Sequence, residues 1–217
     1  MKSIYLLCFI IVLASANIGV TIPGYKEPLP SFFTCLAQKN ITRAIMSIMD
    51  YSGKVNKNFL LAFLNSKIAK FKEFDATVTI TGGFTPEETC NGVAGGLPIS
   101  FNGTVWLELF GGNTLWETPI DQRVSFVENV VKACQNHGLK VGIHSYAYDW
   151  TLILGSQRAG SDILKAVPLW YYTPNESKDF DDFEYARFGT WDAPTMKTYG
   201  EELMCDYSTF SLQYYEA

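Results

Sequence analysis

Several side chains that could do chemistry fall at the ends of apolar, strand-like segments. Glu108 stands near the end of the segment 104–109, and His144 ends the segment 139–144. A carboxylate and an imidazole that lie side by side can hold or transfer a proton. Later segments carry four tyrosines at or near their ends: Tyr171, Tyr172, Tyr199 and Tyr214. Such rings stack on sugars in a binding groove, or they simply fill a core.

Strand-like and helix-like segments alternate along the chain. Apolar and β-branched runs predict eight strands, at 18–22, 43–49, 76–81, 104–109, 139–144, 167–171, 195–199 and 210–214. Amphipathic runs predict helices at 31–38, 56–71 and 119–136, and a further helix that opens at 85–88. In the second of these helices, Phe59, Phe63, Leu64 and Ile68 are expected to point inward.

This alternation predicts an α/β fold with parallel strands and both sheet faces covered. Eight strands predict an irregular, closed, TIM-like barrel whose second half is poor in helices. The active site of such a barrel forms at the carboxyl ends of its strands. These carboxyl ends form one open end of the barrel, its mouth. We therefore expect Glu108, His144 and Asp50 near this mouth, with the tyrosines as a substrate groove.

The first sixteen residues have the pattern of a cleavable signal peptide. Lys2 precedes a short apolar run, and Ala14-Ser15-Ala16 supplies a cleavage site. The run is too short to span a membrane, which takes about 20 residues. We expect residues 1–16 to be removed and residues 17–217 to form one domain, either secreted or delivered to the lumen of a lysosome or phagosome.

The cysteines agree with an oxidising compartment. Loss of the leader leaves Cys35, Cys90, Cys134 and Cys205, which can form two disulfides in three arrangements. Barrel closure favours Cys35–Cys205, because the opening helix then neighbours the last strands. It also favours Cys90–Cys134, which would join the helices that follow the third and fourth strands.

Charge and composition limit the partners. Removing the leader, with its single lysine, takes the net charge from −5 to −6, and no basic stripe suggests nucleic acid. Asn40, Asn102 and Asn175 begin glycosylation sequons. The acidic run Asp179, Asp181, Asp182 and Glu184 lacks the spacing of a calcium loop and is interpreted as a solvated loop. We expect a monomer with no metal and no cofactor.

Motifs from the fourth strand onward resemble glycoside hydrolase family 25, a lysozyme family. The resemblance rests on Val105-Trp-Leu-Glu-Leu-Phe-Gly-Gly112 with Trp116, and on Gly138-Leu-Lys-Val-Gly-Ile-His-Ser145 with Tyr148 and Trp150. Leu169-Trp-Tyr171, Phe180-Asp-Asp-Phe183 and Phe188-Gly-Thr-Trp191 fit its eukaryotic branch. The resemblance implies an irregular eight-stranded barrel that hydrolyses muramic-acid linkages in bacterial peptidoglycan without a cofactor.

The same resemblance indicates that most catalytic carboxylates are replaced. The family's strand-one Asp corresponds to Thr21, and its Asp-x-Glu pair on strand four corresponds to Glu108 and Phe110. The last Asp corresponds to Ser211. Glu108 is then the only matching carboxylate, and it is one methylene longer than the family's Asp.

These observations favour a secreted lysozyme-like protein that has lost the usual hydrolytic machinery and retains glycan binding or a defence role. One alternative is an active muramidase that uses Glu108 with an unusual partner such as His144. Another is a secreted protein-interaction or signalling module with no glycan ligand.

Overall fold

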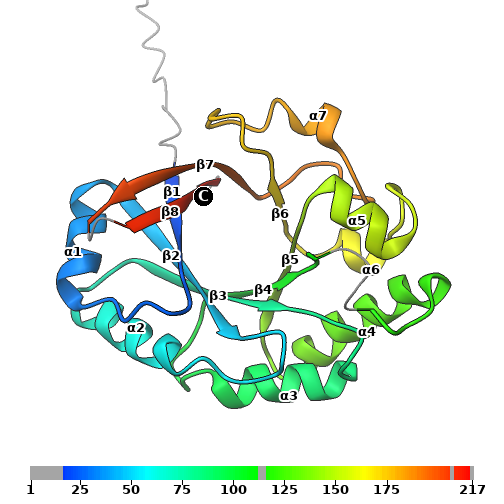
Figure 1. The fold of residues 1–217 in the computed structure, drawn as a ribbon, viewed down its shortest axis with the longest axis horizontal. Helices are drawn as coiled ribbons and strands as arrows, with labels where there is room; N and C mark the ends of the chain where they lie inside the picture. The colour runs from blue at the N-terminus through cyan, green and yellow to red at the C-terminus, as the bar shows by residue number, and fades with distance from the viewer. Residues whose placement is uncertain (1–16, 112–115, 206–207, 216–217) are drawn as a thin grey trace, which may run out of the picture.

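The strands close into a barrel. A computed structural model describes residues 17–111, 116–205 and 208–215, so the predicted leader 1–16 lies outside the described residues. The strands are β1 (Asn17–Ile22), β2 (Ile41–Met49), β3 (Glu73–Thr79), β4 (Thr104–Glu108), β5 (Lys140–Ser145), β6 (Leu169–Tyr172), β7 (Met196–Met204) and β8 (Ser208–Tyr215). They follow one another around the barrel in chain order (Figure 1). The predicted α/β barrel is therefore confirmed.

The pairing is parallel from β1 to β7, but β8 runs antiparallel to both of its neighbours, β7 and β1. The expectation of parallel pairing throughout is wrong at this strand. Only residues 205–207 separate β7 from β8. A parallel pair needs a crossover of a dozen or more residues, so the chain turns back as a hairpin instead.

Helices connect most of the strands. They are α1 (Pro30–Gln38), α2 (Lys57–Ile68), α3 (Pro86–Gly96), the 3₁₀ turn η2 (Ile120–Gln122), α4 (Arg123–Asn136), α5 (Ala147–Leu154), α6 (Asp162–Lys165) and α7 (Phe183–Ala186). Helices α1 to α4 follow the outside of the first strands, whereas the β7–β8 side of the ring is built mainly from strands (Figure 1). Because α6 and α7 are single turns, the second half is poor in helix, as predicted.

Helix α2 buries a narrower stripe than the sequence pattern predicts. Phe59, Ala62, Phe63 and Ser66 are buried at helical spacing. Leu64 is 47% exposed and Ile68 is 68% exposed, so the expectation that these two point inward is wrong. At about 100° per residue, both lie on the face of the helix roughly opposite this stripe, which turns them away from the barrel.

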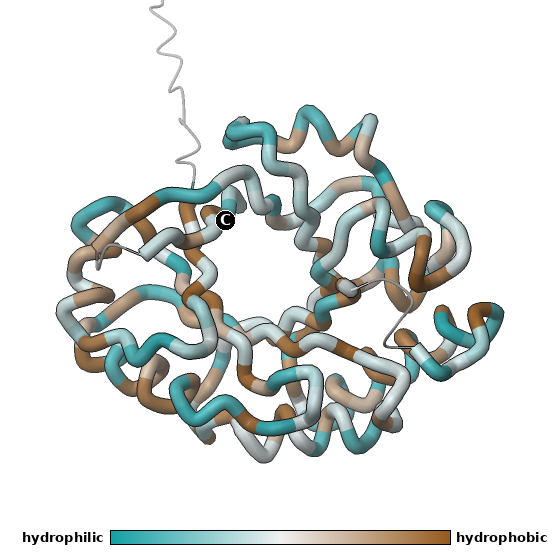
Figure 2. Tube along the Cα trace, in the orientation of Figure 1, coloured by the Kyte–Doolittle hydropathy of each residue, from teal (hydrophilic) through white to brown (hydrophobic). Residues whose placement is uncertain are grey.

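Side chains fill the barrel interior. Ile45, Trp106, Trp170, Met196 and Tyr215 form one buried cluster there. The rings of Trp106 and Trp170 meet edge to face with centroids 5.6 Å apart. A larger cluster packs between the strands and the helices. Brown hydrophobic segments follow much of the ring, while the β6–β7 connection is mostly hydrophilic (Figure 2).

Two disulfides join distant parts of the chain. Cys35 of α1 is bonded to Cys205 after β7, and Cys90 of α3 is bonded to Cys134 of α4. Both predicted pairings are confirmed. The first ties the beginning of the barrel to its end, and the second ties together two helices on the outer wall.

The surface contains the three sequon asparagines. Asn40 precedes β2, Asn102 precedes β4 and Asn175 follows β6, and all three are exposed. Exposure meets the steric requirement for glycosylation at each site. Within 17–111, 116–205 and 208–215, no helix has the length and apolar character needed to cross a bilayer.

Candidate functional site

The barrel mouth collects polar side chains from interior strand positions. Thr79 of β3, Glu108 of β4 and His144 of β5 lie on adjacent strands at matched register positions. They share the interior face of the barrel with two tryptophans. Trp106 lies two residues before Glu108 on β4, and successive side chains of a strand alternate between faces. Trp170 of β6 is the register partner of His144. The carboxyl ends of these parallel strands therefore present Glu108 between a hydroxyl and an imidazole.

Glu108 is held by both neighbours. Its Oε2 accepts a hydrogen bond from the Thr79 hydroxyl at 3.1 Å. Its Oε1 lies 3.2 Å from His144 Nδ1. The Glu108 side chain is 18% exposed, so the carboxylate is reachable from the mouth but not free to rotate in solvent.

His144 is buried between aromatic rings. Its ring lies parallel to Trp170 with centroids 3.4 Å apart, and Phe110 meets it edge-on at 4.6 Å. Burial lowers the pKa of His144 from its ordinary value of 6.5, and the opposing effect of Glu108 does not cancel this. Burial therefore favours the neutral imidazole near pH 7, and a neutral ring that donates to the Glu108 carboxylate carries its proton on Nδ1. Nε2 has no hydrogen-bond partner among the described residues.

Aromatic rings border the mouth beside His144. The Phe110 ring stacks on Tyr146 with centroids 5.7 Å apart, and Tyr146 in turn contacts Tyr172 and Tyr148. Tyr148 is 64% exposed and Tyr172 is 39% exposed. Tyr172 was among the predicted groove residues, whereas Tyr146 was expected only as one of the strand-end positions where the active site forms. Its position directly after β5 was the signal that pointed there.

On the other side of the mouth, uncharged groups bond to one another. Thr21 of β1 and Ser211 of β8 are register partners. Gln213 Nε2 donates to Thr21 Oγ1 and to the Ser211 carbonyl, both at 3.0 Å. Gln213, which is fully buried, lies in the expected strand-end range 211–214 but had no predicted role. This side of the mouth therefore contributes amide and hydroxyl groups.

Comparison with known proteins identifies the family to which this chain belongs. A family model described as Lysozyme-like protein 1 matches residues 15–199. The chain belongs to this lysozyme-like family. Lysozyme-like protein 5 of Caenorhabditis elegans is 28% identical over 207 residues, which cover 91% of this chain and 90% of that protein. The probable GH family 25 lysozyme 5 of Dictyostelium discoideum is 26% identical, covering 86% of this chain and 85% of its own length.

Solved structures agree with the fold. A lysozyme from Streptomyces coelicolor superposes with a TM-score of 0.74 at 11% identity, covering 94% of this chain and 93% of that one. At this identity the likeness shows the barrel fold alone. Together with the sequence relatives, it confirms the resemblance to glycoside hydrolase family 25.

The positions compared with the family's catalytic residues lie at one end of this lysozyme-like barrel. Thr21 is the penultimate residue of β1, Glu108 ends β4, and Phe110 follows Glu108 by two residues. Ser211 reaches the same end because β8 runs antiparallel to β1. Of these four positions, Glu108 is the one that holds a carboxylate.

Three tyrosines predicted for the groove lie elsewhere. Tyr171 and Tyr199 are buried in the cluster outside the barrel, and Tyr214 packs against Phe180 beside that cluster. Strand alternation explains this, since Tyr172 faces the interior and Tyr171 must therefore face outward. The prediction that these three tyrosines line the groove is therefore wrong. Of the predicted groove residues, Tyr172 and His144 lie at the mouth.

The acidic loop between β6 and β7 is partly internal. Asp182 Oδ1 accepts from the Tyr171 hydroxyl at 2.6 Å and from Lys197 Nζ at 2.8 Å. Lys197 is fully buried. Burial, reinforced by Asp182, raises the pKa of Tyr171. The interpretation of this loop as wholly solvated is wrong at Asp182, which pairs a buried ammonium.

Two further acids, Asp50 and Asp149, are already engaged in hydrogen bonds. Asp50 is exposed and accepts hydrogen bonds within its own turn, from the Ser52 amide and hydroxyl and from the Lys54 amide. Asp149 is buried in α5 and accepts from the Gly111 amide at 3.0 Å, which fixes the chain just after β4. No cluster of three or more metal-ligating side chains occurs in the described ranges.

Sequence reasoning also missed an ionic group at the opposite end of the barrel. Asp75 is buried and accepts from the Trp106 indole at 3.0 Å and the Thr104 amide at 2.9 Å. Arg43 lies 3.5 Å from Asp75 and is also paired with Glu73. Burial raises the pKa of Asp75. Since this end holds the amino ends of the parallel strands, the network is structural.

Proposed function

We propose that this chain is a secreted lysozyme-like protein whose barrel mouth binds glycan but does not hydrolyse it by the usual two-carboxylate mechanism. One observation carries the proposal. Phe110 stands two residues after Glu108, where the family resemblance places a carboxylate, and its ring packs against His144 and Tyr146.

The chemistry of glycoside cleavage explains why this matters. The reaction needs a proton for the leaving oxygen and a negative charge near the positively charged transition state, usually from two carboxyl groups. Glu108 supplies one carboxylate. Phe110 has no proton to donate, and Thr21 and Ser211 remain uncharged at working pH. Loss of the general acid costs about 10²–10⁴-fold in rate.

His144 does not replace the missing acid. Its lowered pKa leaves it neutral near pH 7, with its Nδ1 proton engaged by Glu108. The remaining nitrogen, Nε2, is enclosed and carries a lone pair rather than a proton. The pair thus holds the Glu108 carboxylate in place but offers no acidic hydrogen to a leaving group.

Glycan binding is supported by the mouth's exposed rings and hydrogen-bonding groups. Tyr148 and Tyr172 expose ring surface beside Tyr146, and aromatic faces with a polar hydroxyl suit the apolar and polar faces of a sugar. The Glu108 carboxylate between Thr79 and His144 can accept hydrogen bonds from sugar hydroxyls.

A pull-down with fluorescently labelled, insoluble peptidoglycan tests this proposal. We expect the wild-type protein to be retained and Tyr148→Ala and Tyr172→Ala to weaken retention about tenfold each. Tyr185→Ala is the matched control, because Tyr185 is 88% exposed on α7 outside this ring cluster. Failure of the wild type to bind would refute glycan binding and favour a protein-interaction module.

The second candidate function is an active muramidase that uses Glu108 with His144. The observation in its favour is their contact of 3.2 Å at the mouth. Lysis of bacterial cells by the purified protein, abolished in Glu108→Gln, would establish this alternative over the first.

The proposal places the mature chain outside the cell or in a lysosomal or phagosomal lumen. It is supported by the signal-peptide pattern of residues 1–16, the two disulfides and the three exposed sequons. Amino-terminal sequencing of the natural protein should begin at Asn17, and peptide-N-glycosidase should reduce its apparent mass. A retained leader on the natural protein would contradict secretion by cleavage.

A further inference from the structure

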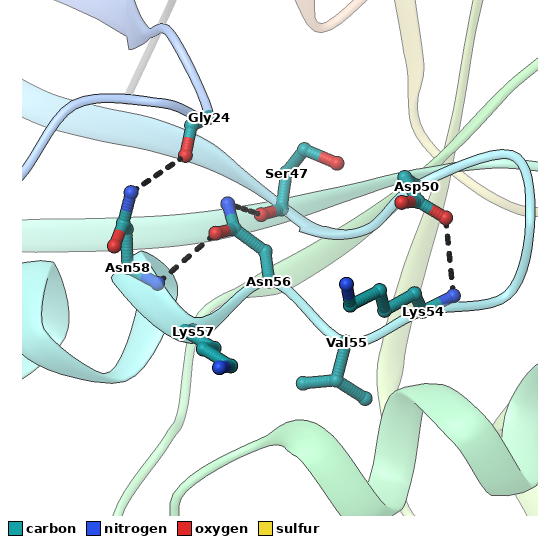
Figure 3. A pocket seen from close by; sticks show the side chains of 8 residues that line it. All are labelled: Gly24, Ser47, Asp50, Lys54, Val55, Asn56, Lys57 and Asn58. Atoms are coloured by element: carbon teal, nitrogen blue, oxygen red, sulfur yellow. Dashed lines mark hydrogen bonds between the residues drawn. The ribbon is translucent and has the colours of Figure 1, made fainter.

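A cavity of about 460 Å³ opens on the mouth side of the barrel, beside β1 and β2 (Figure 3). Gly24, just beyond β1, and Ser47, two residues beyond the interior Ile45 of β2, form part of its lining. The loop 50–55 and the start of α2 complete the lining. The cavity is separate from the Glu108–His144 contact, which involves β4 and β5.

Hydrogen bonds hold the walls of this cavity in place without a ligand. Asn56 Nδ2 donates to the Ser47 carbonyl at 2.8 Å, and Asn58 Nδ2 donates to the Gly24 carbonyl at 3.2 Å. The Asn56 amide also donates to the Ile48 carbonyl at 2.8 Å. Two asparagines thus fix the start of α2 against the ends of β1 and β2, so the cavity is preorganised.

The cavity is cationic although the chain is acidic overall. Lys54 and Lys57 line it, and neither ammonium has a salt-bridge partner among the described residues. Asp50 is the acid in the lining, and its carboxylate is already bonded within its own turn. The Lys54 side chain extends along the cavity toward Asn56 (Figure 3). Two ammonium groups therefore face one carboxylate.

The position of the cavity relates it to the proposed glycan site. In the closed strand order, β1 and β2 lie across the barrel from β5 and β6 (Figure 1). Tyr146 and Tyr172 come from the β5–β6 side. A saccharide that stacks on these tyrosines and crosses the mouth past Glu108 arrives at Lys54 and Lys57.

We propose that this cavity is a subsite for a carboxylate group of a cell-wall glycan fragment, bound by Lys54 and Lys57. This inference rests on the proposed glycan-binding function. Ammonium groups attract a carboxylate as point charges, and such charge-assisted hydrogen bonds are about twice as strong as neutral ones. The carboxylate belongs either to the lactyl group of muramic acid or to the peptide attached to it.

Calorimetric titration with three soluble probes tests the subsite. The probes are the N-acetylglucosamine–N-acetylmuramic acid disaccharide, the same disaccharide bearing an acidic tripeptide, and the neutral oligosaccharide chitotetraose. We expect Lys54→Gln/Lys57→Gln to weaken binding of an acidic probe about tenfold and to leave chitotetraose binding unchanged. Lys70→Gln/Lys132→Gln removes the same charge from exposed positions outside the cavity and should leave binding of all three probes unchanged.

The outcomes separate this inference from the proposed function. Weakened binding of both acidic probes assigns the lactyl carboxylate, and weakened binding of the tripeptide probe alone assigns the peptide. Equal losses for acidic and neutral probes, or no loss for any probe, would overturn the subsite while leaving glycan binding intact. If the wild type binds none of the probes, both the glycan-binding proposal and the subsite fail.

Discussion

Glu108 Oε1 lies 3.2 Å from His144 Nδ1, and the two residues occupy matched register positions on β4 and β5. The imidazole of this pair is sandwiched between Trp170 and the edge of Phe110. The carboxylate that ends β4 therefore orients a buried neutral histidine. In a hydrolase of this fold it would instead work with a second acid.

Burial of His144 should make stability depend on pH. Its folded-state pKa is lowered, so below about pH 6.5 the unfolded chain binds a proton that the folded chain does not. The free energy of unfolding should therefore fall as the pH falls below that value. Urea denaturation from pH 7.5 to 4.5 should show a shallower fall in His144→Gln than in the wild type. The exposed-site control His137→Gln should follow the wild type, and parallel curves for all three would contradict this account.

Asp182 should be important for stability because it pairs the fully buried Lys197. Asp182→Ala leaves that ammonium without its ionic partner, which costs about 3–5 kcal/mol in the free energy of unfolding. Asp181→Ala removes an adjacent exposed carboxylate and should change stability by about 0.5 kcal/mol or less. Thermal or urea denaturation of the two variants checks the contrast. Equal effects would show that Lys197 does not depend on Asp182.

The two disulfides should differ in how much they stabilise. Cys35 and Cys205 are 170 residues apart, and Cys90 and Cys134 are 44 apart. The chain-entropy model assigns about 5 kcal/mol to the longer loop and about 4 kcal/mol to the shorter one. Denaturation of the double serine variants should therefore show the larger loss for Cys35→Ser/Cys205→Ser. The reverse order would mean that strain or residual structure outweighs loop entropy.

Phe110→Glu should restore a second acid at the mouth. The new carboxyl would lie among His144 and Tyr146, where burial raises its pKa toward that of a general acid. We expect this variant to release peptidoglycan fragments about 10²-fold faster than the protein-free background, at which the wild type stays. Phe110→Gln, which has a similar shape without the acid, should remain inactive. Equal activity in the glutamate and glutamine variants would exclude a role for the added carboxyl.

Much of the fold followed from the sequence because alternating strand and helix patterns predict a closed barrel, and barrel closure makes neighbours of the elements that carry the paired cysteines. The eight apolar runs and the two disulfides follow from these patterns. The direction of β8 did not follow, because it depends on the short connection at 205–207 rather than on its own apolar pattern. The outward turn of Leu64 and Ile68 on α2 was also missed, since these apolar residues lie on the face opposite the buried stripe and an apolar residue need not be buried.

The sequence predicted which residues lie at the carboxyl ends of the strands. It did not predict which side chains point into the barrel and which point outward. Glu108, His144 and Thr21 were placed at the mouth by position alone. Tyr171 and Tyr172 are adjacent, and one residue of register decides which of them faces the interior. The Gln213–Thr21 bond joins opposite ends of the chain, and Asp75 pairs Arg43 across strands. No local pattern reveals such contacts.

The central claim is that the positions compared with the family's catalytic residues hold one carboxylate, Glu108, and that hydrolysis by the usual two-carboxylate mechanism is therefore lost. It is tested most directly by chromatographic analysis of muropeptides released from purified peptidoglycan by the wild-type protein between pH 4 and pH 7. We predict that no released fragments exceed those of a protein-free control. Fragments that appear with the wild type and disappear with Glu108→Gln would contradict the account.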